Sequence, residues 1–286
     1  MRGMGLLGAH VSVSGGAEKA VARASELGCD AFQIFVKSPN RWANSARPAA
    51  ESARFREDRE RSGMPVMAHA GYLINLASPN VEVAEKSRRA LVDELRRCAA
   101  LGVPGLVLHP GAPQNDGREV GIDRVAAGLD AVLAEVADAP VRVLLENTAG
   151  QGSTLGVTPT ELQAIRSRLA EPSRVGVCLD TCHAFAAGYD LRSEEGYQRL
   201  IDEVGAGPGI ETVAAWHLND SKFPLGKHRD RHENIGQGEI GLDCFARLLA
   251  DASFSEAPMI LETPLGDDED GHARDLATLA SLRAAG

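Results

Sequence analysis

Eight short apolar runs rich in Val, Ile and Leu recur along the 286 residues, and each is followed by a longer polar or amphipathic stretch. Successive runs are separated by roughly 30 to 45 residues, the size expected of a βαβ unit. Eight strand-then-helix units in one chain predict an α/β fold of the (β/α)8 TIM-barrel type. The runs are GLLGAHVS, CDAFQIFVK, PVMAHAGY, GLVLHPG, VRVLLENT, RVGVCLDTC, TVAAWHLND and PMILETP.

The stretches between these runs can hold the helices that cover a barrel. In SPNVEVAEKSRRALVDELRRCAALG, Ser78 and Pro79 suit the N-cap and the first turn, and Gly102 suits the end of the helix. The stretch GIDRVAAGLDAVLAEVADA has a similar helical pattern. No low-complexity linker or change of composition divides the chain, so we expect a single TIM-barrel domain over residues 1–286.

A polar residue stands at the end of nearly every apolar run. The carboxyl ends of barrel strands are where active sites are built. Strand ends that were merely more hydrated would carry scattered Ser, Asn and Lys, whereas this set is drawn only from His, Asp and Glu. The sequence therefore predicts a site at that end of the barrel. The residues are His10, His69, His109, Glu146, Asp180, His217 and Glu262.

Histidine, aspartate and glutamate are the usual nitrogen and oxygen ligands of zinc and similar divalent metals. His183 follows Asp180 by three residues, and Asp230 and His232 stand two apart in KHRDRHENIGQGEIG, where an extended loop places both on one side. His10 has no ligand position, and a contact to a ligand or to phosphate competes there with a structural hydrogen bond. The candidate ligands are His69, His109, Glu146, Asp180, His183, His217, Asp230, His232 and Glu262.

The number of candidates indicates more than one metal ion. One ion takes three or four protein ligands, so nine candidates with one bridging carboxylate would serve three ions. Metal ions about 4 Å apart can clamp the attacking and leaving oxygens of a phosphoryl displacement. The predicted reaction class is therefore phosphoester hydrolysis.

Composition limits the cellular setting and the partners. The net charge of -10 argues against strong non-specific binding to nucleic acid, although bound cations weaken that argument locally. Five cysteines are few and odd in number, which favours a reducing, cytoplasmic compartment. No apolar run approaches the ~20 residues that span a membrane, and the N-terminal segment lacks the apolar core of a signal peptide.

Long motifs surround the candidate ligands, and with them the sequence resembles the endonuclease IV family (AP endonuclease family 2) of apurinic/apyrimidinic endonucleases. The motifs are HAGYLINLASP, ENTAGQGSTLG, GVCLDTCHAFAAGYDLR, and HLNDSK followed by DRHENIGQGEIG. The resemblance extends from GAHVSVSGG to LETP. It implies a xylose isomerase-like TIM barrel and a metal-dependent DNA repair hydrolase of the deoxyribonuclease IV class. Such an enzyme cleaves duplex DNA 5′ to an abasic site, leaves a 3′-hydroxyl and a 5′-deoxyribose phosphate, trims blocked 3′ ends and is a monomer.

The resemblance also implies three Zn²⁺ ions per chain, with Mn²⁺ as an alternative at one or more positions. A hydroxide between two of the ions would be the nucleophile, and Glu146 would be the bridging ligand. The three implied ligand groups are His69, His109 and Glu146; then Glu146, Asp180, His217 and Glu262; then His183, Asp230 and His232.

The same resemblance assigns DNA contacts. Tyr72 and Leu73 match residues that are inserted at the lesion, a wedge strategy, while ordinary packing at a strand end is the alternative. In KSPNRW, Asn40 stands where the family commonly has an arginine two residues before the tryptophan, so either Arg41 takes that role or Asn40 makes a weaker contact. Basic residues expected partly on the loop face would attract phosphate. They are Arg2, Lys37, Arg41, Lys222, Lys227, Arg229 and Arg231.

Two rival functions share parts of this pattern. A metal-dependent sugar isomerase of the same barrel superfamily would use a Glu, Asp, His, Glu set and leave the other five candidates without a role. A non-catalytic lesion-binding protein would keep the inserted residues without an intact ligand set. Cys178 and Cys182 flank Asp180, and we interpret both as packing residues because the ligand set is complete without them.

Overall fold

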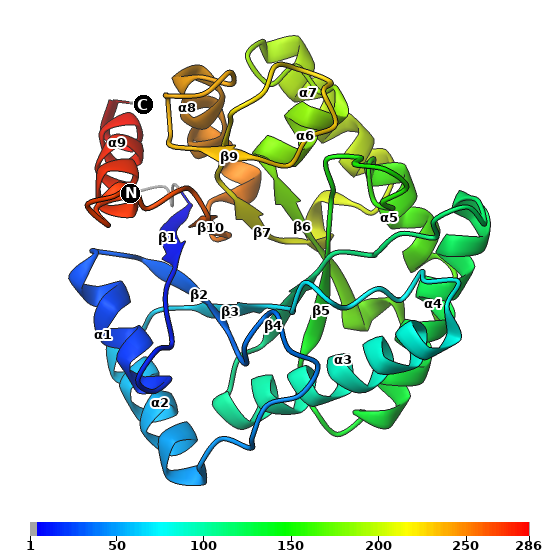
Figure 1. The fold of residues 1–286 in the computed structure, drawn as a ribbon. Coiled ribbons are helices and arrows are strands. Elements are labelled where there is room, and N and C mark those ends of the chain that lie inside the picture. Colours follow the sequence, from blue (N-terminus) through cyan, green and yellow to red (C-terminus); the bar gives the residue numbers. More distant parts are fainter. Residues whose placement is uncertain (1–4, 286) are drawn as a thin grey trace.

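The computed structural model describes residues 5–285, in which eight parallel strands close into a barrel (Figure 1). Neighbouring barrel strands follow one another along the chain, and the last pairs with the first. Each of the eight apolar runs forms one of these strands, so the predicted TIM barrel is confirmed. The strands are β1 (Leu6–His10), β2 (Ala31–Phe35), β3 (Val66–His69), β4 (Gly105–Leu108), β5 (Arg142–Glu146), β6 (Val175–Asp180), β7 (Val213–His217) and β10 (Pro258–Leu261).

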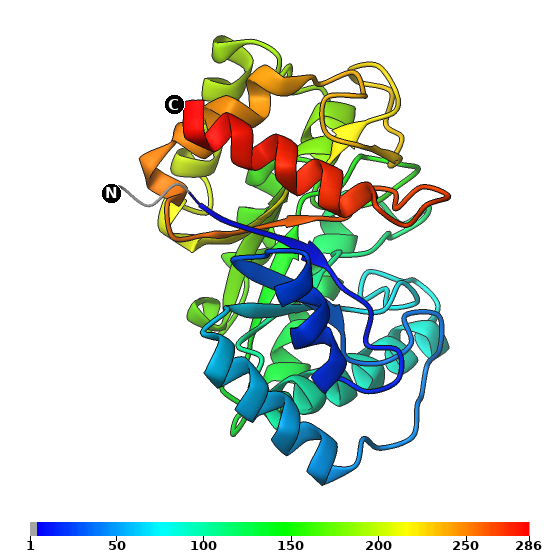
Figure 2. The same ribbon diagram turned by 90° about the vertical axis from the view of Figure 1, so that its left-hand side faces the viewer.

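Helices surround the barrel, and the longer loops gather at the carboxyl ends of the strands, on the right-hand side of Figure 2. A small hairpin of β8 (Asp220–Ser221) and β9 (His232–Glu233) lies within the connection from β7 to β10. Three short 3-10 helices precede β6, β7 and β10. The helices are α1 (Glu18–Glu26), α2 (Ala49–Ser62), α3 (Val81–Leu101), α4 (Arg118–Glu135), α5 (Pro159–Arg166), α6 (Thr181–Ala187), α7 (Glu194–Ala206), α8 (Leu242–Ala250) and α9 (Gly271–Ala285).

Helix α3 begins two residues later than its sequence suggests. Its N-cap is Asn80, whose side chain accepts hydrogen bonds from the amides of Glu82 and Val83. The predicted cap, Ser78, instead accepts the amide of Asn80 and so shapes the turn that precedes the helix. The predicted end is confirmed, because Gly102 takes the left-handed conformation that terminates a helix with least strain.

Two layers of side chains fill the barrel. Alternate residues of a strand share a face, so each strand sends one side chain inward and another two positions later. The first layer is small or apolar and forms a separate buried cluster that includes Cys178, which confirms Cys178 as a packing residue. The second layer, at the carboxyl ends, is polar on all eight strands. It consists of His10, Gln33, His69, His109, Glu146, Asp180, His217 and Glu262.

Two further features concern the helices and the cysteines. None of the helices in residues 5–285 is both long and apolar enough to cross a membrane. All five cysteines are free and buried.

Candidate metal centre

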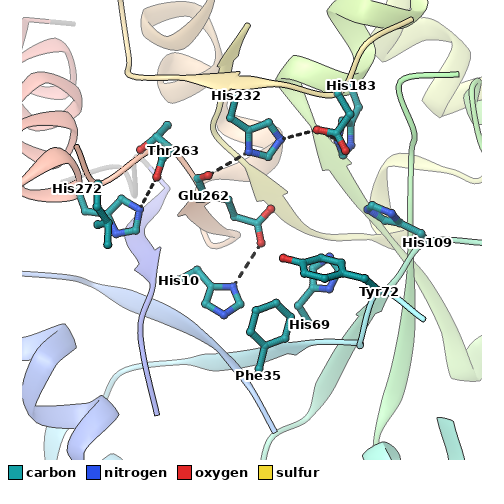
Figure 3. Close-up of a pocket in the computed structure, with 12 residues that line it drawn as sticks. His10, Phe35, His69, Tyr72, His109, His183, His232, Glu262, Thr263 and His272 are labelled. Carbon is teal, nitrogen blue, oxygen red and sulfur yellow. Dashed lines mark hydrogen bonds and ion pairs between the residues drawn. The ribbon is translucent and has the colours of Figure 1, made fainter. Parts of the chain in front are cut away.

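The ligand atoms of all nine candidate residues converge at the carboxyl end of the barrel. Figure 3 shows five of these residues around the cavity, which are His69, His109, His183, His232 and Glu262. They fall into the same three groups that the family resemblance implies, and within each group the atoms lie within 4.8 Å of one another. The groups are His69, His109 and Glu146; Glu146, Asp180, His217 and Glu262; and His183, Asp230 and His232.

Glu146 belongs to two of these groups because its two oxygens face different neighbours. At the end of β5 this fully buried carboxylate places Oε2 at 3.2 Å from Nε2 of His69 and 2.7 Å from Nε2 of His109. Its Oε1 lies 2.7 Å from Nδ1 of His217. This is the arrangement of a carboxylate that bridges two metal positions.

The third group joins α6 to the connection between β7 and β10. Oδ1 of Asp230 lies 3.3 Å from Nε2 of His183 and 3.4 Å from Nε2 of His232. Both ring nitrogens are buried and find no hydrogen-bond partner among the described residues. One cation bound between the two ring nitrogens and the carboxylate of Asp230 would give all three groups a partner.

Hydrogen bonds to backbone carbonyls fix the tautomers of three of these histidines. A carbonyl oxygen only accepts, so Nδ1 of each ring carries a hydrogen, and Nε2 is the nitrogen left to bind a metal ion. These Nε2 atoms face carboxylate oxygens, so each pair of atoms shares a positive charge, which is either a proton on the ring or a metal ion. The donor set therefore fits divalent metal ions. The three bonds run from His69 to Ala70 (2.7 Å), from His183 to Asn147 (2.9 Å) and from His232 to Glu262 (3.0 Å).

His217 is oriented by Gln33, a residue that the sequence analysis missed. Nε2 of His217 lies 2.9 Å from Oε1 of Gln33, and Nε2 of Gln33 donates to Glu262 at 2.6 Å. Gln33 is fully buried and also lies 3.0 Å from Nδ1 of His10, which itself contacts Glu262 at 3.4 Å. As an amide, Gln33 does not share the His, Asp and Glu pattern of the other strand ends. The signal was its position, two residues beyond the inward-facing Ala31.

Two asparagines, also missed, position Asp180. The side chain of Asn219 donates to Oδ2 of Asp180 at 2.6 Å and accepts the amide of Glu262 at 2.8 Å. Asn147 exchanges hydrogen bonds with the backbone of Asp180 at 2.6 and 3.1 Å. Oδ1 of Asp180 caps α6 by accepting the amide of His183. The short turn from Asp180 to His183 thus connects the second group to the third.

The electrostatics of the centre favour a cation. Burial raises the pKa of Glu146, but the charges of His217 and His109 outweigh it and hold the pKa well below its usual range. Burial likewise raises the pKa of Asp230, yet His183 brings it down to about 2. Burial lowers the pKa of His183, and Asp180 and Asp230 outweigh that effect and raise it well above the usual value. Glu146 and Asp230 are therefore ionised at neutral pH, and the positive charge that compensates them comes from the histidines, whose protons a metal ion would replace.

A cavity of about 410 Å³ lies over the centre, and Tyr72 stands at its rim, over His69 (Figure 3). The side chain of Tyr72 is 63% exposed. Its ring packs edge-on against that of Phe35, with the two ring centroids 5.5 Å apart. Leu73 is half-buried and is not part of the cavity lining. The side chains of Asn40 and Arg41 are both exposed on the loop after β2, so each remains a candidate for the lesion-strand contact.

The predicted set of phosphate-attracting residues is wrong at Lys37. This side chain is buried because it forms an ion pair with Glu94 at 3.2 Å, and its ammonium group donates to the carbonyl of Trp42. Arg2 lies outside the described residues. The other predicted bases, which are Arg41, Lys222, Lys227, Arg229 and Arg231, are exposed.

Cys182 lies close enough to Asp180 and His232 to form a fourth group of potential ligands. However, burial raises the pKa of its thiol to about 12, and the thiol approaches the carbonyl of Arg231 at 3.6 Å. The thiol is therefore protonated while no metal ion is bound, and its polar contact is to a backbone carbonyl. The geometry is that of a packing residue.

Comparisons with known proteins agree with this geometry. A family model described as a xylose isomerase-like TIM barrel matches residues 21–282. The chain is 46% identical to a probable endonuclease 4 of Geobacter sp. (strain M21) over 280 residues, covering 98% of this chain and 99% of the relative. It is 45% identical to a probable endonuclease 4 of Chloroflexus aurantiacus, covering 96% and 97%.

Solved structures separate the family from the wider fold. The structure of endonuclease IV from Thermus thermophilus superposes with a TM-score of 0.87 at 37% identity, covering 98% of this chain and all of the other. A D-tagatose 3-epimerase-like protein reaches a TM-score of 0.73 at only 18% identity, which shows a shared barrel and no more. The sequence likeness over nearly the whole length and the three ligand groups lead to one assignment: the chain belongs to the endonuclease IV family.

Proposed function

We propose that this protein is a metal-dependent DNA repair endonuclease that hydrolyses the phosphodiester 5′ to an abasic site in duplex DNA. The observation that carries the proposal is the convergence of nine ligand side chains into three groups, two of which share Glu146. Family membership, on full-length matches to probable endonucleases, supports the class of DNA-cleaving hydrolase. The expected products are a 3′-hydroxyl and a 5′-deoxyribose phosphate.

The residues of the centre would hold three Zn²⁺ ions, with Mn²⁺ as an alternative. When bound, the ions supply an activated water and neutralise charge on the phosphate and the leaving oxygen. Glu146 would bridge two of them through its separate oxygens. Gln33 and Asn219 would keep His217, Asp180 and Glu262 aimed at the same point.

Lesion recognition would fall to the loops at the rim. The exposed ring of Tyr72, together with Leu73, would enter the gap left by a missing base, because an abasic site removes the stacking that resists such a wedge. Arg41 would contact the lesion strand, and the exposed bases of the loop after β7 would contact phosphates. A blocked 3′ end presents the same phosphoester chemistry, so we also propose trimming of such ends.

We further propose a monomer with a single domain that acts in the cytoplasm. Five buried, free cysteines suit a reducing compartment. Because the cavity lies within one chain and the three ligand groups are complete in it, a second subunit is not needed for the site.

A sugar isomerase remains the rival chemistry, because Glu146, Asp180, His217 and Glu262 form a four-residue group by themselves. That function would leave the third group without a role, although its two histidines present unpartnered buried nitrogens. Hydrolysis at a multinuclear centre accounts for all three groups.

The decisive experiment uses a duplex with a tetrahydrofuran abasic analogue, which cannot react by β-elimination. Metal-replete protein should nick it on the 5′ side, EDTA should stop the reaction, and added zinc should restore it. Glu262→Gln should lower kcat/KM by about a thousandfold, since it removes a charged ligand, while the exposed Glu256→Gln serves as the matched control. Absence of nicking by metal-replete protein, or full activity of Glu262→Gln, would reject the hydrolytic assignment.

A further inference from the structure

A buried ion pair lies between the two loops that carry the proposed lesion contacts. Lys37 follows β2, and Glu94 lies in the middle of α3. The Nζ and Oε1 atoms are 3.2 Å apart, and the side chains are 2% and 1% exposed. Neither residue is a candidate metal ligand. Removing two charges from water is costly, so their burial calls for additional hydrogen bonds that satisfy both.

Those additional hydrogen bonds hold one loop each. The ammonium group of Lys37 donates to the carbonyl of Trp42 at 3.1 Å, which fixes the loop that carries Arg41. The carboxylate of Glu94 accepts the amide of Gly71 at 3.1 and 3.3 Å, which fixes the loop that carries Tyr72.

The two loops also touch directly beside the ion pair. The amide of Tyr72 donates to the carbonyl of Pro39 at 3.1 Å. A Cβ atom on Gly71 would come within 3.0 Å of that carbonyl and 3.2 Å of Oε1 of Glu94, so a larger residue would push the loops apart. Gly71 thus lies in close contact with both the carbonyl of Pro39 and the carboxylate of Glu94.

Helix α3 offers a matched contact that involves only one of the loops. Arg97 donates to the carbonyls of Ser45 and Asn44 at 3.1 and 2.9 Å. The loop between β2 and α2 crosses α3 at this point (Figure 1). Arg97 also pairs with Oδ2 of Asp93 at 2.9 Å, and the same oxygen lies 3.7 Å from Nζ of Lys37. Loss of Arg97 would therefore free part of this loop and leave the Lys37–Glu94 pair and the hydrogen bonds to Gly71 with their partners.

We propose that Lys37 and Glu94 form a latch, a pair of positioning residues that fixes the backbones of Arg41 and Tyr72 relative to one another. The latch presents the two loops to damaged DNA as one preorganised surface, which lowers the entropic cost of binding. The proposal rests on the proposed function, because it assumes that both loops contact the lesion. A buried pair of this kind contributes a specific arrangement more than net stability.

The first test measures amide hydrogen exchange in the metal-loaded protein without DNA. Lys37→Met and Glu94→Gln should each raise exchange at Gly71 and Tyr72 by about tenfold or more, and so should the double variant Lys37→Met/Glu94→Leu. Besides its ion pair with Glu94, Lys37 bonds the loop that carries Arg41 and makes no hydrogen bond to the loop that carries Tyr72. Faster exchange at Tyr72 in Lys37→Met therefore reports coupling between the two loops. The control Arg97→Met should raise exchange near residues 43–46 alone. Unchanged protection of Gly71 and Tyr72 in the double variant would overturn the latch.

The second test measures steady-state nicking of the abasic duplex. Each variant of the latch should raise KM by about tenfold and leave kcat within about twofold, because no proposed metal ligand is altered. The apolar double variant should regain thermal stability, since replacing both charges removes the unpaired one. If the double variant regains both thermal stability and the wild-type KM, the pair is only structural and the latch is refuted. If wild-type protein fails to nick the duplex, the proposed function fails, and the exchange experiment still decides whether the loops are coupled.

Discussion

The imidazole of His217 is oriented by the side chain of Gln33, since Nε2 of the ring and Oε1 of the amide lie 2.9 Å apart. The other ring nitrogen, Nδ1, then faces Oε1 of Glu146 at 2.7 Å and Oε2 of Glu262 at 3.3 Å. The amide nitrogen of Gln33 donates to Glu262 at 2.6 Å. One neutral side chain therefore sets the tautomer of one proposed ligand and the rotation of another.

Replacing Gln33 by alanine should weaken zinc binding at the group that contains His217. Loss of an outer hydrogen-bond partner of a metal ligand typically costs about 10–100-fold in affinity. Titration against a chromophoric zinc chelator would measure this directly, and the third group should keep its affinity because Gln33 does not contact it. The exposed Gln198 offers a matched Gln→Ala control. Equal zinc affinity in Gln33→Ala and Gln198→Ala would remove Gln33 from the centre.

The barrel and the ligands were predictable because both follow from a period of two residues. On seven of the eight barrel strands an inward apolar residue is followed two positions later by the polar residue of the site, as Leu144 is by Glu146 and Cys178 by Asp180. The turn carrying His183 and the loop carrying Asp230 were found because these residues stand three positions from Asp180 and two from His232, inside motifs that resemble those of the family.

Other features depend on partners that are distant in the sequence. Lys37 was expected to be exposed, and its burial follows from Glu94 on a helix that packs beside the loop. Gln33 has no charge and no unusual spacing, so its role becomes visible only when His217 and Glu262 are placed around it. The start of α3 at Asn80 was missed because Ser78, Pro79 and Asn80 all favour helix beginnings, and the choice among them is made by geometry.

Metal retention should fall as the pH is lowered. The Nε2 atom of His183 must lose its proton to bind metal, and the facing Asp180 and Asp230 outweigh burial and raise the pKa of this ring well above 6.5. Protons therefore compete with metal even above the usual histidine range, and affinity rises with pH through it. Elemental analysis should find about three zinc ions per chain after dialysis near pH 8 and fewer near pH 5. One ion per chain at the higher pH, or no loss at the lower, would contradict the proposed centre.

Tyr72 should matter more for damaged than for intact DNA. Its side chain is 63% exposed and rests on Phe35 at the rim, so it adds little to the core. Tyr72→Ala should weaken binding to an abasic duplex by about tenfold or more, because stacking of an aromatic ring on a base contributes about 1–3 kcal/mol. Binding to the intact duplex should change by less than about twofold, as fluorescence anisotropy would show for both.

The conservative variant Tyr72→Phe is the control for this prediction. It keeps the ring and removes only the hydroxyl, so its affinity for the abasic duplex should stay near that of the wild type. If Tyr72→Ala loses affinity equally for both duplexes, the residue acts through packing against Phe35 and not through the lesion.

Cys182→Ser should leave nicking activity and zinc content close to those of the wild type. The sulfur lies near Asp180 and His232, yet burial raises the pKa of the thiol to about 12, which opposes loss of its proton, and the three ligand groups are complete without it. A serine hydroxyl can replace the weak S–H contact to the carbonyl of Arg231. The expected cost is a modest loss of thermal stability, because a buried apolar group becomes polar. Loss of one zinc ion per chain in this variant, measured beside wild-type protein, would instead make Cys182 a ligand of the third group.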